Sequence, residues 1–438
     1  MSRGHLLYLA FWFPPSRASG VYRALGTTRA FVDAGWEVTV VTADTEYFSE
    51  IIGSTDESLL ATIPDGVDIR RVPMPKPRQA PEYPLRSWIK STFPNLWRVL
   101  RKARGRFDRT SVDHASGLVE PYTGWIEPAR AEGRRVAADG GIDHILATGN
   151  PFSSFEVAAR LAGDLSIPYT IDYRDPWTIV SYTEKKADLP MSVRYAEARI
   201  VAGANACVHV NKPLASAYSS LYPEFSEKMK VVENGFDPQS VRSPIGPYEG
   251  GPIRAGMLGT VTDLWPMEAV VQGWAEAREG LPSGSELILG GHLGYFARSK
   301  AGIEAGFPGT ASGFRYVGPV PKSEVAGFYE SLDVVVVPIP GGRLVTSGKV
   351  YEAVAQGIPV VCVQADGGDG RRVADEYSLG LSASPLASDV ARGIAEAAKL
   401  RMELTVEGIA EARREAGRYE RALMLSHLVD LVEGTVDD

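Results

Sequence analysis

The chain of 438 residues is longer than one hydrophobic core usually supports, so its length predicts two domains. Its composition, 44% hydrophobic, 23% charged and 9% aromatic, is that of an ordinary globular protein and excludes a fibrous or largely disordered chain. The formal net charge of −8 argues against broad binding of nucleic acid, because a phosphate backbone is held mainly by clustered Lys and Arg.

The cysteines and the apolar stretches indicate the compartment. Both cysteines, Cys207 and Cys362, lie in apolar, strand-like runs that suit buried thiols in a reducing environment. The apolar residues 6–13 are few and run straight into a Pro-rich loop without a cleavage site, so they predict a buried strand and not a signal peptide. No apolar stretch approaches about 20 residues, the length of a membrane-spanning helix. We therefore expect a cytoplasmic protein.

The first half of the chain alternates between strand and helix patterns. Residues 5–13 and 36–44 predict strands, and residues 22–35 between them show helical apolar spacing that ends at Gly35. Similar units follow from residue 141 to residue 237. Strands separated by helices form parallel sheets, so residues 1–238 predict an N-terminal Rossmann-like domain.

The pattern is interrupted once and then restarts. Residues 239–253 are rich in Pro, Gly and Ser, which predicts a linker. Residues 254–415 again alternate and predict a second Rossmann-like domain, and residues 416–438 predict a C-terminal helix able to pack back on the first domain. The predicted fold class is α/β, with two doubly wound Rossmann-like domains facing across a cleft. Ligands of such sheets bind beyond the carboxyl ends of the strands.

One segment of the second domain combines a strand, a tight turn and a short helix. Residues 346–361 predict a helix capped by Ser347, with Lys349, Glu352 and Gln356 on one face. The helix N-terminus and Lys349 suit a phosphate, and Glu352 can accept two hydrogen bonds from a sugar diol. The alternative is a solvated ion pair of Lys349 and Glu352, three residues apart, with no ligand. This segment alone favours neither interpretation.

The order of several motifs adds a resemblance. Residues 317–339 and 347–361, together with residues 13–44, 167–177 and 231–237, resemble the corresponding segments of retaining GT-B-fold glycosyltransferases. That class includes glycogen synthase and bacterial cell-surface sugar transferases, in the family-four group. The resemblance implies a nucleotide-sugar donor bound by the C-terminal domain, an acceptor bound by the N-terminal domain, and transfer that retains the anomeric configuration.

The resemblance also suggests site residues, with Glu352 at the donor ribose. The expected donor-binding residues are Gly20, Gly259, Thr260, Val320, Arg343, Thr346, Ser347, Gly348, Lys349 and Glu352. The catalytic or sugar-binding candidates in the cleft are Asp172, Arg174, Asp175 and Asn150. For the aspartates and Arg174, the alternative is a local ion pair that fixes the loop. For Gly20, the alternative is an ordinary loop glycine.

The sequence departs from the family pattern at three places. Leu344 stands where the first of two glutamates is usual, and Asn150 lies in the loop that often carries a histidine. The usual basic pair after the first strand of the C-terminal domain is missing, so we expect Arg343 and Lys349 to neutralise the phosphates. No Asp-x-Asp and no metal-ligand spacing of histidines occurs, so no metal or other cofactor is expected.

Two questions stay open at this stage. The function has two alternatives to a transferase: a nucleotide-sugar epimerase of the same architecture, or a catalytically silent binding protein. The acceptor of a transferase would be a glycan, a lipid-linked sugar or a small molecule, and the sequence does not identify which. Residues 84–107 interleave basic and aromatic side chains. They suit peripheral contact with an anionic membrane or a phosphorylated acceptor, the alternative being a solvated helix and loop.

Overall fold

The computed structural model describes most of the chain. The described residues are 2–53, 55–74, 111–113, 115, 117–181, 183–243, 246–294, 297–309 and 312–436. The basic aromatic segment 84–107 lies outside them, so its membrane contact stays a prediction. Within the described ranges, no helix combines the length and the apolar character that a bilayer crossing requires.

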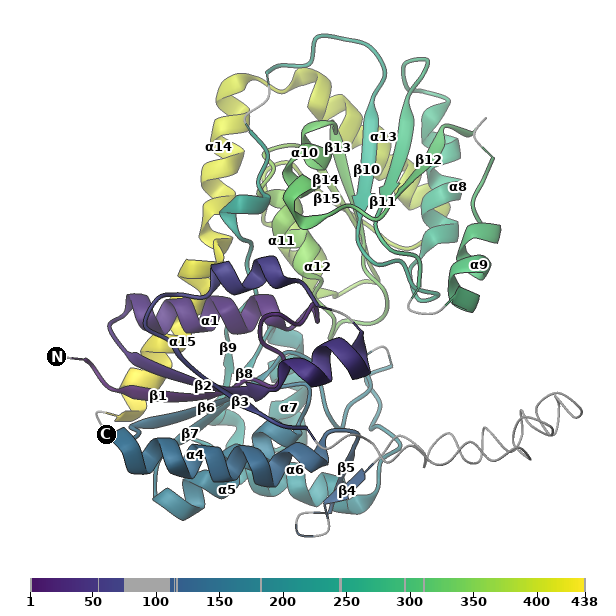
Figure 1. Ribbon diagram of the computed structural model, residues 1–438. Coiled ribbons are helices and arrows are strands. Elements are labelled where there is room, and N and C mark those ends of the chain that lie inside the picture. The colour runs from purple at the N-terminus through teal and green to yellow at the C-terminus, as the bar shows by residue number, and fades with distance from the viewer. Residues whose placement is uncertain are drawn as a thin grey trace, which may run out of the picture.

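The N-terminal domain is built on a seven-stranded parallel sheet (Figure 1). In spatial order its strands are β3 (Asp68–Val72), β2 (Glu37–Ala43), β1 (His5–Leu9), β6 (His144–Gly149), β7 (Tyr169–Tyr173), β8 (Ala206–His209) and β9 (Met229–Val231). The strand order reverses between β1 and β6, which pair in parallel with Leu6 opposite His144. Such a reversal leaves a crevice at the carboxyl edge of the sheet.

The C-terminal domain repeats this arrangement with six parallel strands. Their spatial order is β12 (Phe314–Gly318), β11 (Glu286–Gly290), β10 (Arg254–Leu258), β13 (Val334–Pro338), β14 (Val360–Val363) and β15 (Gly380–Ala383). Here the order reverses between β10 and β13. The two sheets confirm the predicted fold class of two doubly wound Rossmann-like domains.

Helices connect and cover the strands. Those of the N-terminal domain are α1 (Val21–Asp33), α4 (Ile126–Gly140), α5 (Ser153–Leu165), α6 (Met191–Gly203) and α7 (Lys212–Leu221), with a hairpin of β4 (Ser111–Asp113) and β5 (Leu118–Glu120). Those after β10 are α8 (Met267–Arg278), α9 (Ala297–Ala305), α10 (Val325–Glu330), α11 (Gly348–Val354), α12 (Asp369–Asp375), α13 (Ala387–Glu403), α14 (Val406–Ala416) and α15 (Arg421–Val436). As predicted, α1 is followed by Gly35, whose φ of 88° favours glycine.

The alternation of side chains along β1 explains why its sheet carries two apolar layers. Leu6 and Tyr8 belong to one buried cluster, and Leu7 and Leu9 belong to the cluster on the opposite face. Each face therefore needs helices to exclude water from it. This is the reason for the nearly continuous apolar character of the strand in the sequence.

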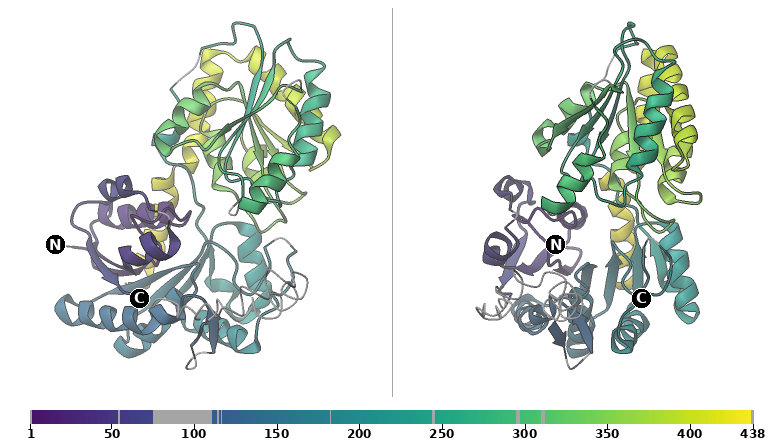
Figure 2. Two further views of the ribbon diagram at one scale, coloured as in Figure 1. Left: turned by 45° about the vertical axis from the view of Figure 1, so that its right-hand side comes forward. Right: turned by 90° about the vertical axis from the view of Figure 1, so that its right-hand side faces the viewer.

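The last helix, α15, completes the N-terminal domain although it follows the C-terminal one. It lies beside α1, and Figure 2 shows it reaching down from the upper domain to the lower one in both views. Leu425, Leu428, Val429 and Val432 are buried with the α1 side chains in the same cluster. The chain thus crosses between the domains twice, which restrains their relative position.

The contribution of α15 can be measured with two leucines of the same helix. Leu428 is fully buried and Leu423 is 48% exposed. We expect Leu428→Ala to lower the free energy of unfolding by about 2–5 kcal/mol because it leaves a cavity, and Leu423→Ala to change it by less than about 0.5 kcal/mol. Urea denaturation of both variants tests this, and equal effects would contradict the packing of α15.

Candidate active site

Two of the predicted cleft residues, Arg174 and Asn150, meet the predicted donor-binding Gly20 at the carboxyl edge of the N-terminal sheet. Arg174 follows β7 and donates from Nε to the carbonyl of Gly149 (3.0 Å) and from a terminal nitrogen to the carbonyl of Asn150 (2.6 Å). Its guanidinium lies against Gly20, where an added Cβ would come within 2.0 Å of a guanidinium nitrogen. The glycine predicted to admit a ligand therefore makes room for the side chain of Arg174.

Asp172 and Asp175, in contrast, lie apart from this group. Asp172 is fully buried and forms a two-point ion pair with Arg23 of α1, with N–O distances of 2.7 and 2.8 Å. Asp175 is exposed. An Asp–Arg pair does form, as the alternative interpretation proposed, but its arginine lies 149 residues away in the sequence. Burial keeps the Asp172 carboxylate out of contact with a ligand in the cleft.

Arg23 also holds the segment that leaves the N-terminal sheet. Its guanidinium donates to the carbonyls of Val232 (3.0 Å) and Glu233 (3.3 Å) and to the side-chain oxygen of Asn234 (3.2 Å). Sequence reasoning missed this residue, since nothing in the helical pattern of α1 marks one buried arginine among its apolar neighbours. The pair with Asp172 therefore positions residues 232–234 next to the second domain.

The donor candidates of the C-terminal domain gather where β10, β12 and β13 end. Leu258, Trp265, Ser347 and Lys349 line one small hollow, together with residues 335–338 of β13. Gly259 follows Leu258 and donates its N–H to the carbonyl of Gly290 (3.1 Å), and an added Cβ on Gly259 would meet the Trp265 ring at 3.0 Å. Two further candidates near these strand ends, half-buried, are Thr260 and Val320.

The turn and helix predicted for residues 346–361 are present. Ser347 caps α11 and accepts a hydrogen bond from the N–H of Lys349 (3.3 Å), while Gly348 is exposed as the first helical residue. Lys349 and Glu352 form an ion pair, as the alternative interpretation of this segment predicted, with 2.5 Å between Nζ and Oε2. The Lys349 side chain is 33% exposed and the Glu352 side chain 21%. Both charged groups therefore remain within reach of a ligand.

Gln356 does not share the exposed face with this pair, and that part of the helix prediction was wrong. Helix α11 ends at Val354, and Gln356 is fully buried. Its side-chain oxygen accepts from the N–H of Arg242 (2.9 Å), and its amide donates to the carbonyl of Glu352 (2.6 Å). The residue therefore fastens the predicted linker to α11.

Glu352 faces side chains from both domains. The pKa of Tyr329 in α10 is raised well above its ordinary value, mainly by burial and next by the negative charge of Glu352. Burial raises the pKa of Tyr22 in α1 as well, and Asp56 and Glu352 contribute to the increase. Because Tyr22 comes two residues after Gly20, the start of α1 lies within electrostatic range of the half-buried pair on α11.

The segment before α11 is docked on the N-terminal domain. Leu344 is buried in the cluster that contains Val210 and Leu214 of that domain. Arg343 donates from Nε to Glu184 (3.0 Å), an exposed pair that lowers the pKa of Glu184. The position where the family carries a carboxylate is thus occupied by an apolar contact between the domains.

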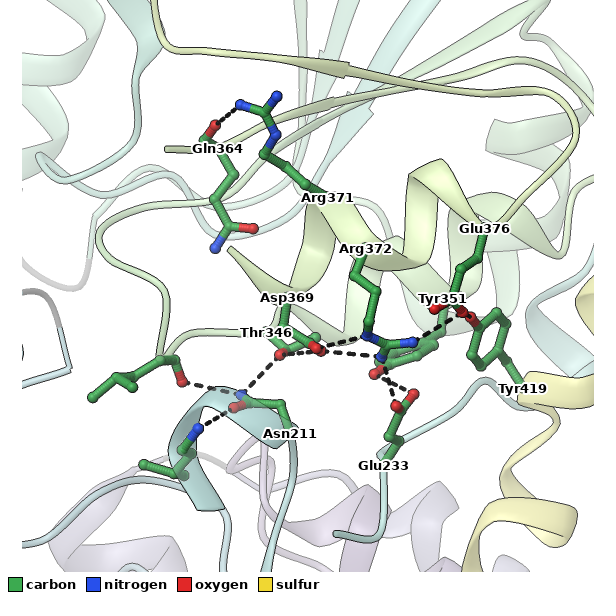
Figure 3. A network of polar contacts seen from close by, with 12 residues as sticks. Asn211, Glu233, Thr346, Tyr351, Gln364, Asp369, Arg371, Arg372, Glu376 and Tyr419 are labelled. Atoms are coloured by element: carbon green, nitrogen blue, oxygen red, sulfur yellow. Dashed lines mark hydrogen bonds and ion pairs between the residues drawn. The ribbon is translucent and has the colours of Figure 1, made fainter. Parts of the chain in front are cut away.

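Thr346 lies at the centre of the polar network in Figure 3. Its hydroxyl accepts from the side-chain amide of Asn211 (2.9 Å) and donates to Asp369 (2.9 Å). Asp369 in turn accepts from Arg372 (2.8 Å). Sequence reasoning missed Asn211, Asp369 and Arg372; the only signal was the Asn-Lys-Pro start of α7, which predicts a helix cap but not an interdomain contact.

A cleft of about 1140 Å³ opens between the domains beside this network. Arg343 and Leu344 line it, whereas Lys349 lines the separate hollow at β10 and β13. The charged residues of the cleft come from both domains and have both signs: Glu184, Lys186, Lys212, Arg343, Asp366, Asp369, Arg371, Arg372, Asp375 and Glu376. Such a lining suits a polar ligand with many hydroxyl groups.

Two histidines of the N-terminal sheet do not take part in the site. Burial lowers the pKa of His144 and of His209 to about 3, so both are neutral in the core. Across the described ranges, no group of three or more His, Cys, Asp or Glu side chains is placed to hold a metal ion. The charged groups at the site are therefore the lysines, arginines and carboxylates described above.

Two family models match this chain, and together they cover most of its length. A family model described as a glycosyl transferase 4-like domain matches residues 20–235, and one described as glycosyl transferases group 1 matches residues 267–399. None of the curated proteins matches the sequence.

Several solved structures share the fold at low sequence identity. Anabaena HepE in complex with UDP is 13% identical at a TM-score of 0.64, with 98% of this chain and 100% of that chain covered. Sucrose-phosphate synthase from Thermosynechococcus elongatus is 14% identical at a TM-score of 0.63, covering 99% and 100%. A Listeria monocytogenes protein described as a candidate UDP-N-acetylglucosamine 2-epimerase is 13% identical at a TM-score of 0.54, covering 99% and 96%.

The structural role of Asp172 can be separated from a role in the cleft. We expect Asp172→Asn to lower the free energy of unfolding by about 3–5 kcal/mol, because it leaves the buried guanidinium of Arg23 without its countercharge. The exposed Asp175→Asn should stay within about 0.5 kcal/mol of the wild type. Urea denaturation measures both; an Asp172→Asn protein of unchanged stability would contradict this assignment.

Leu344 allows a second test, since the family carries a glutamate there. Because the side chain is buried against the N-terminal core, we expect Leu344→Glu to lower the free energy of unfolding by on the order of 3 kcal/mol. Leu344→Met conserves volume and should cost less than about 1.5 kcal/mol. Thermal or urea unfolding measures the stability of the two variants. If Leu344→Glu is as stable as Leu344→Met, residue 344 does not pack on the N-terminal core.

Proposed function

Because the chain belongs to the GT-B glycosyltransferases of the glycosyl transferase 4 type, we propose that it transfers a sugar from a nucleoside-diphosphate sugar to an acceptor hydroxyl with retention of configuration. The observation that carries this proposal is the partly exposed pair of Lys349 and Glu352 at the carboxyl edge of the C-terminal sheet. The similar HepE structures contain UDP and UDP-glucose, which supports a nucleotide-sugar donor. The acceptor would be a glycan, a lipid-linked sugar or a small molecule.

Donor binding would exchange the ion pair for contacts with the nucleotide. Lys349 would bind the diphosphate, and Glu352 would accept hydrogen bonds from the ribose diol. Each charge-assisted hydrogen bond contributes about 1.5–3 kcal/mol, whereas an ion pair three residues apart on a helix contributes only about 0.2–0.5 kcal/mol. The exchange is therefore favourable, and the pair keeps both groups oriented until the donor arrives.

In the transfer, the bond between the anomeric carbon and the phosphate oxygen breaks as the acceptor oxygen bonds to that carbon on the same face. The acceptor proton passes to the leaving diphosphate, so no protein base is assigned. The main task of the protein is to stabilise the charge that develops on the phosphate. Lys349 and Arg343 supply positive charge from the C-terminal domain. Arg174, beside Gly20 and Asn150, supplies it from the N-terminal domain.

We also propose that the reaction needs no divalent metal. The positive charge that a metal would bring to the diphosphate is available from Lys349, Arg343 and Arg174. This fits the absence of an Asp-x-Asp motif from the sequence. The activity assays should therefore give equal rates with and without EDTA.

The donor site is tested by nucleotide affinity. We expect isothermal titration with UDP, ADP and GDP to find one diphosphate that binds, and Glu352→Ala and Lys349→Ala each to weaken it about tenfold or more, the equivalent of one charge-assisted hydrogen bond. Lys300→Ala is the matched control, because Lys300 forms an exposed helical pair with Glu304 in α9 and is not one of the proposed donor-binding residues. Equal affinities of all three variants would contradict the assignment.

The reaction class is tested with a panel of nucleotide sugars, with and without candidate acceptors. A glycosylated acceptor with retained configuration is the expected product. If epimerised donor forms without an acceptor, the protein is instead an epimerase. The Listeria protein described as a candidate epimerase has a similar fold. Failure of every nucleoside diphosphate to bind would overturn both enzymatic functions and leave a silent binding protein.

A further inference from the structure

We propose that Asn211 is a positioning residue for the donor-binding turn, so that contact between the two domains orders the turn that receives the donor. The proposal rests on the function proposed above, because that function makes residues 346–348 part of the donor site. Asn211 belongs to the N-terminal domain, at the end of β8, and the turn belongs to the C-terminal domain. It touches the turn and not the substrate, so it acts through Thr346.

The orientation of the Asn211 side chain is determined within its own domain. The side chain is fully buried, and its oxygen accepts from the N–H of Leu214 (2.7 Å) as the cap of α7. The amide nitrogen must then point away from the helix, where it donates to the carbonyl of Leu344 (3.1 Å) and to the hydroxyl of Thr346 (2.9 Å). An amide can cap the helix and donate two hydrogen bonds to the turn at once, whereas a hydroxyl that caps the helix has only one proton to donate.

The hydrogen bonds around Thr346 have a defined direction. Its hydroxyl receives a hydrogen bond from Asn211 and gives its own proton to Asp369. Asp369 is 2% exposed, and Arg372 holds its other oxygen at 2.8 Å. The hydroxyl is therefore fixed between one donor and one acceptor, as Figure 3 shows, and the next residue, Ser347, starts α11 from a fixed point.

The N-terminal domain holds the same helix at a second point. Glu233 accepts from Tyr351 of α11 (2.9 Å) and pairs with Arg372 of α12 (2.5 Å). Burial raises the pKa of Glu233, and the charge of Arg372 opposes that effect. Residues of the N-terminal domain thus hold α11 both at its start and along its length. If the domains separated, the turn would lose Asn211 and Glu233 together.

The experiment reverses the polarity of the network. Asn211→Asp keeps the cap of α7, since Asp caps as well as Asn, but turns an unprotonated oxygen toward Leu344 and Thr346. The double variant Asn211→Asp/Asp369→Asn lets the new amide at position 369 donate to Thr346, while the hydroxyl donates to the new carboxylate at position 211. Asn205→Asp is the control, because Asn205 accepts from the N–H of Tyr169 within the N-terminal domain.

Two measurements on the full-length protein are made for each variant. Hydrogen exchange of the amides of residues 344–350 needs no ligand, and we expect it to accelerate in Asn211→Asp and to return toward the wild-type rate in the double variant. The dissociation constant for UDP should rise about tenfold in Asn211→Asp. It should recover in part in the double variant, where the Thr346 contact is restored but the Leu344 carbonyl still lacks a donor. The melting temperature of Asn211→Asp should fall below that of the control, because the new carboxylate is buried whereas Asn205 is exposed.

Each outcome supports or overturns the proposal. Unchanged exchange in Asn211→Asp, or a double variant no better than the single one, would show that Asn211 does not position the turn. Faster exchange with an unchanged UDP dissociation constant would overturn the link to donor binding. If the wild type itself binds no nucleoside diphosphate, the proposed function is wrong, and so is the effect of Asn211 on donor binding. The exchange rates then still show whether Asn211 orders the turn.

Discussion

Arg23 carries a full positive charge from α1 into the interior of the N-terminal domain, where water does not solvate it. A buried charge of this kind is tolerated only when it is paired and its N–H groups are satisfied. Asp172 supplies the countercharge, and residues 232–234 supply further oxygen atoms. Because Glu233 belongs to that segment and pairs with Arg372, the geometry of the buried ion pair extends to the boundary between the domains.

The two domains meet beyond the carboxyl edges of their sheets, and the contacts there differ in kind. Leu344 contributes an apolar contact, and Asn211 and Glu233 contribute polar ones. Beside these fixed groups, the Lys349 ammonium and the Glu352 carboxylate remain partly exposed and form an ion pair with each other. The site therefore combines a rigid turn with a charged pair that a ligand can displace, which is the preorganisation that tight binding requires.

Sequence reasoning predicted the elements well wherever local pattern decides the structure. The strands, the cap at Ser347, and the placement of Lys349 and Glu352 on one face of α11 follow from apolar periodicity and capping rules. The prediction for Gln356 was wrong because α11 stops at Val354, where the helix gives way to the next strand. Helix ends are set by such tertiary contacts as much as by propensity.

The sequence by itself determined that two parallel α/β domains form, where their strands end, and which segment carries the partly exposed lysine and glutamate. Only the tertiary structure decided which polar residues face the cleft and which are buried. Asp172 pairs with Arg23, Thr346 with Asn211, and Leu344 packs on the opposite domain. The physical reason is that periodicity reports burial along one element, whereas the partner of a polar side chain is set by residues more than a hundred positions away in the sequence.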